Sequence, residues 1–189
     1  MTETLKRIEL HKLKDLINRL PPGKAAMYME ACVWCLSKND HQNGVEFELQ
    51  YRNKNYSYPV YWIDEAIDFQ EINSFYNLDD TVSFGAEAIA MFFCITHTEF
   101  NDLERSTKKT GIDYWLSHEK SNPNLPFQNS GRLEVSGILK ETETNTVAKR
   151  IKEKIKQSEQ SDKTTLPVYI VVVAFDRPYA KMVLKNANS

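Results

Sequence analysis

The sequence predicts an α/β protein with a mixed central sheet flanked by helices, preceded by an N-terminal extension of helices and a β-hairpin. Segments with helical spacing and segments with strand character interleave along the second half of the chain. Residues 167–175 are a β-branched, apolar run without polar alternation, which is typical of a strand covered on both faces. A sheet with helices on both sides would bury such a strand.

Length and composition favour one domain. A chain of 189 residues can bury a sizeable core but is short for two ordinary domains, so we expect residues 1–80 to form the extension and 81–189 the core. The chain is 41% hydrophobic and 26% charged, as in soluble globular proteins. It has neither a membrane-spanning apolar segment nor a secretion-signal pattern at its N-terminus. We therefore expect a cytoplasmic protein that does not enter a membrane.

The N-terminal half contains two helical patterns and one hairpin pattern. Apolar residues at three- and four-residue spacing predict a helix over residues 5–20, which a Pro-Pro-Gly sequence ends. A second helix is expected over residues 25–36. Residues 44–49 and 56–62 flank a segment of turn composition and predict a β-hairpin with one solvent-exposed face. Residues 63–80 are acidic and weakly patterned, and fit either a helix or a loop.

The second half predicts the core. Residues 82–100 are apolar nearly all round, which indicates a mostly buried helix. After a charged segment come two strands, within residues 111–116 and 132–138. A third helix is expected over residues 146–158, and a last strand over residues 179–185 follows the long apolar one.

Cys32 and Cys35 have the spacing of a redox pair or of half a zinc site. A second such pair is absent from the sequence, and both cysteines fall within a predicted apolar helix. The three cysteines also make an odd number in a chain without an export signal, so a disulfide framework is not expected. We favour two buried core thiols.

Asp113 and Glu134 each interrupt a run that otherwise has the composition of a buried strand. A buried carboxylate is costly unless it is paired or binds a metal. Asp113 would satisfy this rule by accepting backbone hydrogen bonds at a strand end, and Glu134 by pairing with Arg132 or Arg150. Alternatively, both acids bind one divalent cation, because Mg²⁺ prefers oxygen ligands and typically takes one or two carboxylates from the protein.

This order of elements, with one acid at the first strand and another in the second, resembles the PD-(D/E)XK nuclease superfamily over roughly residues 82–176. The resemblance implies that Asp113 and Glu134 hold Mg²⁺ or Mn²⁺, with Glu87 as a further acid from the preceding helix. It also implies a metal-dependent DNA endonuclease of a restriction, repair or phage-defence system. For Glu87, stabilisation by a helix N-terminus is the alternative.

The sequence departs from the superfamily pattern at Ser136, where a lysine is expected. Serine cannot orient the attacking water or stabilise the developing charge on a phosphate as a lysine does. Another cation would have to reach the same place, and without one the site would bind metal or nucleic acid without cutting. The candidates are Lys140 and, on the third predicted helix, Lys149, Arg150 and Lys152.

That third predicted helix is also the candidate nucleic-acid-binding surface. The net charge of the chain is −2, so binding to DNA must come from a local basic patch. A charge-rich outer face is equally the default for a helix of a soluble α/β domain. Lys154 and Gln157 form a Lys-x-x-Gln turn that looks like the helix after the second acid in some nucleases of this superfamily. The patch residues are Lys149, Arg150, Lys152 and Lys156.

A rival interpretation is a non-catalytic subunit that keeps the nuclease fold without its chemistry. Such a subunit would bind protein or nucleic acid within a larger complex. Its protein-binding surface would be the aromatic hairpin, since exposed aromatic residues are enriched at interfaces. The hairpin's aromatic residues are Tyr56, Tyr58, Tyr61 and Trp62.

Overall fold

The structure is a computed structural model of the chain. Two predicted connections, at residues 63–80 and 117–130, lie mostly outside the residues that it describes. The described residues are 6–17, 20–63, 77–107, 109–118 and 131–186.

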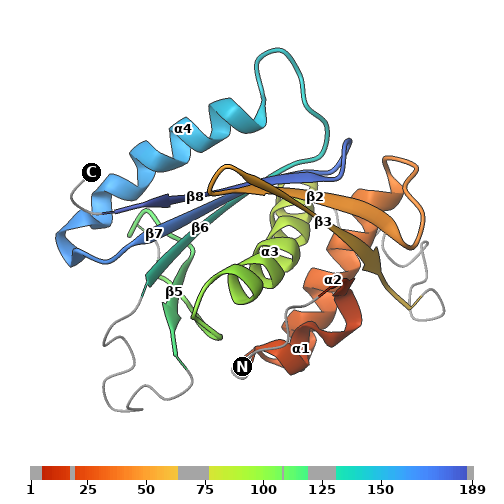
Figure 1. The fold of residues 1–189 in the computed structure, drawn as a ribbon, viewed down its shortest axis with the longest axis horizontal. Helices are drawn as coiled ribbons and strands as arrows, with labels where there is room; N and C mark the ends of the chain where they lie inside the picture. The colour runs from red at the N-terminus through yellow and green to blue at the C-terminus, as the bar shows by residue number, and fades with distance from the viewer. Residues whose placement is uncertain (1–5, 18–19, 64–76, 108, 119–130, 187–189) are drawn as a thin grey trace.

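An eight-stranded mixed sheet forms the centre of the molecule, in the order β1-β3-β2-β8-β7-β6-β5-β4 (Figure 1). Strand β6 runs parallel to β7, whereas β5 is antiparallel to both of its neighbours, β4 and β6. The predicted α/β class with a mixed sheet is thus confirmed. The strands are β1 (Ile8–Glu9), β2 (Val45–Tyr51), β3 (Lys54–Tyr61), β4 (Asp102–Arg105), β5 (Tyr114–Ser117), β6 (Gly131–Ile138), β7 (Val168–Ala174) and β8 (Tyr179–Lys185).

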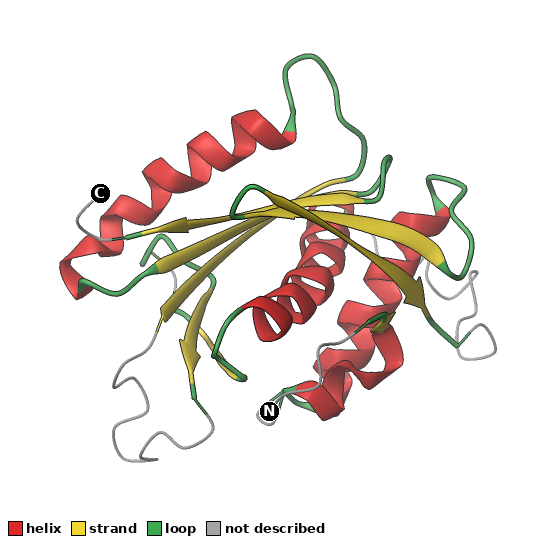
Figure 2. Ribbon diagram, in the orientation of Figure 1, coloured by secondary structure: helices red, strands yellow, loops and turns green. Residues whose placement is uncertain are grey.

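Helices cover both faces of this sheet (Figure 2). Helices α2 (Pro22–Ser37) and α3 (Leu78–His97) pack against each other on one face, together with the short α1 (Leu13–Leu16). Helix α4 (Val147–Ser158) covers β6, β7 and β8 on the opposite face. Among the described residues, the helices are too short or too polar to cross a bilayer.

Strand β7 has a core on each of its faces, as its unbroken apolar sequence predicts. All seven of its residues are buried. Val171 and Val173 belong to the larger core with α2 and α3, whereas Ile170 and Val172 pack with Val147 and Ile151 toward α4. The prediction of a strand covered on both sides is confirmed.

The predicted hairpin is formed by β2 and β3, whose buried and exposed residues alternate. Arg52 and Asn53 connect the strands with φ angles of 49° and 59°. Positive φ at both central residues suits a two-residue turn, because its twist matches that of the strands. Since β2 pairs with β8, the hairpin continues the sheet of the core.

The prediction of one continuous helix over residues 5–20 is wrong. The segment forms β1, a 3-10 helix at Leu10–Lys12, and α1 of only four residues. Ile8 pairs with Val60 at the edge of the sheet, so residues 8 and 9 are extended instead of helical. Ile8 and Leu13 are nevertheless buried, at 2% and 0% exposure. The apolar pattern therefore predicted burial correctly and the backbone incorrectly.

Strand β4 was not predicted, because its sequence Asp-Leu-Glu-Arg has no strand-like alternation of apolar residues. It pairs with β5 at the end of the sheet and buries only Asp102 and Leu103. A charged strand at an edge discourages pairing with other chains. This edge places Arg105 beside the acidic residues described below.

Burial predicts slow modification of the three cysteines. Cys32, Cys35 and Cys94 are free thiols with exposures of 0%, 0% and 1%. Burial raises the pKa of Cys32 well above its usual value and that of Cys94 to about 12, so little reactive thiolate forms. A thiol reagent such as DTNB should react slowly with the native protein and rapidly in denaturant. Rapid native labelling of Cys32 or Cys35 would support the redox alternative instead.

Candidate active site

Asp113 lies immediately before β5 and ends the pairing of β5 with β6. Its backbone N–H donates to the Leu133 carbonyl at 3.0 Å. Its side-chain Oδ2 accepts a hydrogen bond from the backbone N–H of Val135 at 2.9 Å, where the next ladder bond would otherwise form. The strand-end hydrogen bond considered from the sequence is therefore present, but it occupies only one carboxylate oxygen. The side chain remains 25% exposed.

Glu134 follows Leu133, the last residue of β6 that pairs with β5, and its carboxylate lies close enough to that of Asp113 to interact with its charge. Its Oε1 accepts hydrogen bonds from Lys154 Nζ at 2.5 Å and from Gln157 Nε2 at 2.8 Å, both on α4. Its Oε2 is buried and has no hydrogen-bond partner among the described residues. A buried, unpartnered carboxylate oxygen is costly, and it points to a missing cation or donor.

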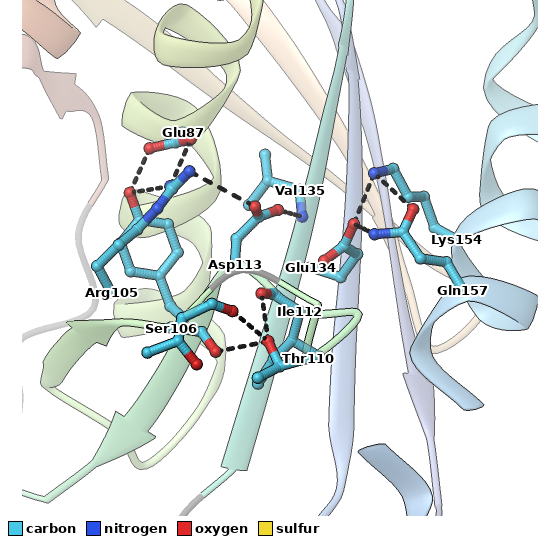
Figure 3. A network of polar contacts seen from close by, with 12 residues as sticks. Glu87, Arg105, Ser106, Thr110, Ile112, Asp113, Glu134, Val135, Lys154 and Gln157 are labelled. Carbon is cyan, nitrogen blue, oxygen red and sulfur yellow. Dashed lines mark hydrogen bonds and ion pairs between the residues drawn. The ribbon is translucent and has the colours of Figure 1, made fainter. Parts of the chain in front are cut away.

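The two carboxylates are close enough to affect each other's charge. Burial and the negative charge of Asp113 raise the pKa of Glu134 from its usual 4.5 to about 7, although Lys154 acts in the opposite direction. Figure 3 shows Asp113 beside Glu134, with Arg105 on one side of the pair and Lys154 on the other. The structure therefore brings together the two acids that the sequence singles out.

The arginines considered as partners of Glu134 bind elsewhere. Arg132 is 0% exposed and donates to the Leu166 carbonyl at 3.0 Å and to Asp162 at 3.2 Å. Arg150 donates from Nε to Asn145 Oδ1 at 2.8 Å. The predicted pairing of Glu134 with either arginine is therefore wrong.

Glu87 lies in the middle of α3 and does not join the other two acids. One of its oxygens accepts a hydrogen bond from Arg105 Nη1 at 2.7 Å, and the other accepts one from the Tyr114 hydroxyl. Because α3 begins at Leu78, stabilisation by the helix N-terminus does not explain Glu87 either. Among the described residues, no group of three or more His, Cys, Asp or Glu side chains is placed to hold a metal ion.

Lys154 takes the place beside Glu134 for which the sequence suggests Lys140. Lys140 is exposed and follows Glu134 by six residues of mostly extended chain, a separation of roughly 20 Å. Lys154 reaches the acid from α4, with its side chain 19% exposed. The only sequence signal for it is the Lys154-x-x-Gln157 spacing, which places both side chains on one helix face.

A groove of about 570 Å³ runs along the C-terminal half of β6, beyond the point where Asp113 ends the pairing with β5. It is lined by Ser136, Lys140, Arg150 and Lys154, with Asp79 from the start of α3. Three basic side chains and one acidic side chain thus line the groove. The other predicted nucleic-acid-binding residues, Lys149, Lys152 and Lys156, are exposed on the outer side of α4.

Two close contacts fix the acids relative to α4. Gly111 has φ +75°, and a Cβ built there would lie 2.5 Å from the Gln157 carbonyl oxygen. The loop before Asp113 therefore rests on the backbone of α4. Near the same end of α4, Arg132 donates to Ser161 Oγ at 2.8 Å and so ties β6 to the segment that follows the helix.

Similarity to known proteins does not assign this site. Comparisons with protein-family models, with curated proteins and with solved structures find no match for this chain. The chemistry proposed below therefore depends on the geometry of the residues themselves.

Gly111→Ala should destabilise the protein and displace Asp113. An alanine at this position would have to adopt a positive φ, which is unfavourable for a residue with a Cβ. Its Cβ would also clash with the backbone of α4. We expect a loss of about 1–3 kcal/mol in the free energy of unfolding, measured with urea. Gly23→Ala is the matched control, because a Cβ at Gly23 meets no atom within 4 Å. Equal stability of both variants would contradict the close contact.

Glu134→Gln should stabilise the metal-free protein at alkaline pH. In the unfolded chain Glu134 ionises near pH 4.5, whereas in the folded protein it stays protonated until about pH 7. The free energy of unfolding of the wild type should therefore fall as pH rises through this window, by about 3 kcal/mol in total. The amide cannot ionise and avoids this loss.

Urea unfolding of both proteins at about pH 5 and about pH 8 checks this prediction. The stability difference in favour of Glu134→Gln should be larger at the higher pH. Glu153→Gln, which removes an exposed carboxylate on the neighbouring helix α4, should show no such pH-dependent gain. If Glu134→Gln were less stable than the wild type by the same amount at both pH values, that result would argue against a strained Glu134 carboxylate.

Proposed function

We propose that the protein is a metal-dependent phosphodiesterase that cleaves DNA, with Mg²⁺ or Mn²⁺ held by Asp113 and Glu134. One observation supports this proposal most strongly. The buried Oε2 of Glu134 has no partner among the described residues and lies beside a second carboxylate. A divalent cation would satisfy that oxygen and remove the repulsion between the two acids.

The residues present fit such an ion. Both side chains offer only oxygen atoms, which suits Mg²⁺ or Mn²⁺ better than zinc. When Glu134 is ionised, Glu87, Asp113 and Glu134 contribute a formal charge of −3, and Arg105 and Lys154 contribute +2, so the cluster has a net charge of −1. One divalent cation changes this to +1. That charge complements a single phosphodiester.

Lys154 is our candidate for the lysine that Ser136 does not supply. Its Nζ lies 2.5 Å from Glu134 Oε1, and Gln157 holds the same oxygen from one turn further along α4. An ammonium group there can hold the attacking water and stabilise negative charge on the phosphate. The Val135 N–H holds Asp113 Oδ2, and the other oxygen, Oδ1, lies 3.7 Å from Arg105 Nη2. The metal, when bound, would polarise the phosphodiester and lower the pKa of a water.

The element order supports a nuclease-like core. A buried helix (α3), a strand led by Asp113 (β5), a strand containing Glu134 (β6), a helix (α4) and a parallel strand (β7) follow in the order on which the resemblance to PD-(D/E)XK nucleases rests. Strand β4 is an addition to the predicted order. Work in a restriction, repair or phage-defence system is part of the same proposal.

The basic groove supports nucleic acid as the substrate. Lys140, Arg150 and Lys154 line it, and phosphate groups are bound by such side chains without regard to sequence. Lys149, Lys152 and Lys156 extend the positive charge over the outer face of α4. DNA is the substrate we infer, and RNA is the comparison substrate in the experiment.

The second candidate function is a non-catalytic subunit, and Ser136 at the lysine position is the observation that favours it. Its proposed aromatic surface is weakened by the fold. Tyr58 and Trp62 are each 6% exposed and pack inward, whereas Tyr61 is 40% exposed. A single exposed tyrosine is a small docking surface.

The test is cleavage of labelled single- and double-stranded DNA, and of RNA, with Mn²⁺, Mg²⁺ or EDTA. Asp113→Asn should abolish both Mn²⁺ binding and cleavage, because it removes a ligand. Lys154→Met should retain Mn²⁺ binding and slow cleavage by about 10²–10³-fold. Mn²⁺ binding is measured by the EPR signal of the free ion, independently of activity.

Lys12→Met is the control for Lys154→Met. Lys12 also pairs with a glutamate, Glu9, at 2.8 Å, but lies near β1 at the far edge of the sheet. Its loss should leave cleavage and Mn²⁺ binding unchanged. Cleavage that persists in EDTA or in Asp113→Asn would refute the assigned site, and Mn²⁺ binding without cleavage of any substrate would favour the non-catalytic subunit.

A further inference from the structure

We propose that Arg105 is a catalytic residue that contacts the substrate phosphate at the acid pair, and that Glu87 and Tyr114 are positioning residues that hold Arg105 in place. This inference rests on the function proposed above and deepens it. It also gives a role to the buried Glu87 carboxylate, which the acid pair does not use.

One side of the Arg105 guanidinium is fixed. Its Nη1 donates to Glu87 Oε1 at 2.7 Å and to the Tyr114 hydroxyl at 2.9 Å. Its Cζ lies 4.9 Å from the centre of the Tyr114 ring. The Tyr114 hydroxyl also bonds Glu87 and lies 2.8 Å from the hydroxyl of Tyr28. The arginine is therefore ordered before any substrate binds, which lowers the entropy cost of each new hydrogen bond.

The other side of the guanidinium remains available. Nη2 lies 3.7 Å from Asp113 Oδ1, which is beyond hydrogen-bond distance, and it donates no hydrogen bond within the described part of the chain. The Arg105 side chain is 43% exposed. A guanidinium presents its donors as a planar fork, which matches two oxygens of a phosphate. Nη2 thus faces the place where a phosphate at the acid pair would lie.

Arg105 and Lys154 flank the two acids from opposite sides, as Figure 3 shows. Negative charge on a phosphodiester increases as its bond is broken. Cations fixed on both sides of that position stabilise the transition state more than the ground state. Lys154 comes from α4 and Arg105 from β4, so neither can replace the other.

The burial of Glu87 supports a positioning role. Its side chain is 1% exposed, and a buried ion pair repays the cost of removing both charges from water only when its geometry is good. Here the pair lies beneath an arginine that reaches the surface of the site. The alternative is that Arg105 only neutralises Asp113 until a metal arrives. In that case its removal should strengthen metal binding without slowing cleavage.

The experiment compares Arg105→Gln and Arg105→Lys with Arg177→Gln. Arg177 is the matched control, because it pairs with Glu141 at 2.5 Å and lies over the Tyr179 ring at 4.2 Å, away from the acids. The two readouts are the single-turnover rate of DNA cleavage at saturating Mn²⁺ and Mn²⁺ binding by EPR with and without inorganic phosphate. Phosphate should strengthen Mn²⁺ binding to the wild type.

Arg105→Gln should slow cleavage by about 10²–10³-fold, retain Mn²⁺ binding, and lose the strengthening by phosphate. Arg105→Lys should recover part of the phosphate effect, and Arg177→Gln should behave as the wild type. Glu87→Gln should slow cleavage less than Arg105→Gln, and adding it to Arg105→Gln should have no further effect. This non-additivity would not follow from two independent structural defects.

Wild-type cleavage and an intact phosphate effect in Arg105→Gln would overturn the inference while leaving the proposed function in place. A wild type that binds no Mn²⁺ would overturn both. If Arg105→Gln proves unstable to urea, Arg105→Lys alone decides, because it keeps the charge and loses the fork. A cleavage rate and phosphate effect equal to those of the wild type in Arg105→Lys would then contradict the proposed contact.

Discussion

The hydrogen bond from the Val135 N–H to the Asp113 carboxylate is the interaction on which the site depends. It ends the pairing of β5 and β6 with a side chain in place of a backbone carbonyl. That ending leaves the rest of β6 uncovered on one side, where the groove lies. It also holds the Asp113 carboxylate across from Glu134. One bond therefore fixes where the sheet opens and where the acids meet.

The site concentrates charge that a stable fold would avoid. Glu87 and Glu134 are each 1% exposed, and Glu134 keeps one oxygen without a partner among the described residues. Arg105 and Tyr114 bond both oxygens of Glu87, whereas Lys154 and Gln157 bond only one oxygen of Glu134. Strain retained at such a place suits a site that awaits a ligand, since substitutions that relieve it often cost function.

Sequence patterns predicted the elements in which local periodicity and tertiary burial agree. The hairpin, α4 and β7 have regular patterns and a single compatible structure. The first helix failed because Ile8 pairs with a strand distant in sequence, and β4 was missed because Leu103 is its only buried apolar residue. The sequence singled out the two acids, because a carboxylate inside a buried strand is energetically costly. Arg105 was not recognisable as a partner, and Lys154 was marked only by its spacing to Gln157, because the sequence does not show which cation reaches a distant carboxylate.

The Arg132 tie has a mechanical consequence. Because this buried arginine joins the start of β6 to the segment after α4, the wall of the groove that carries Lys154 and the strand that carries Glu134 form one rigid body. By contrast, β4 and β5 are held at the edge of the sheet by short ladders. Asp113, although it precedes β5, is hydrogen-bonded to Leu133 and Val135 of β6 and therefore belongs to this rigid body together with Glu134.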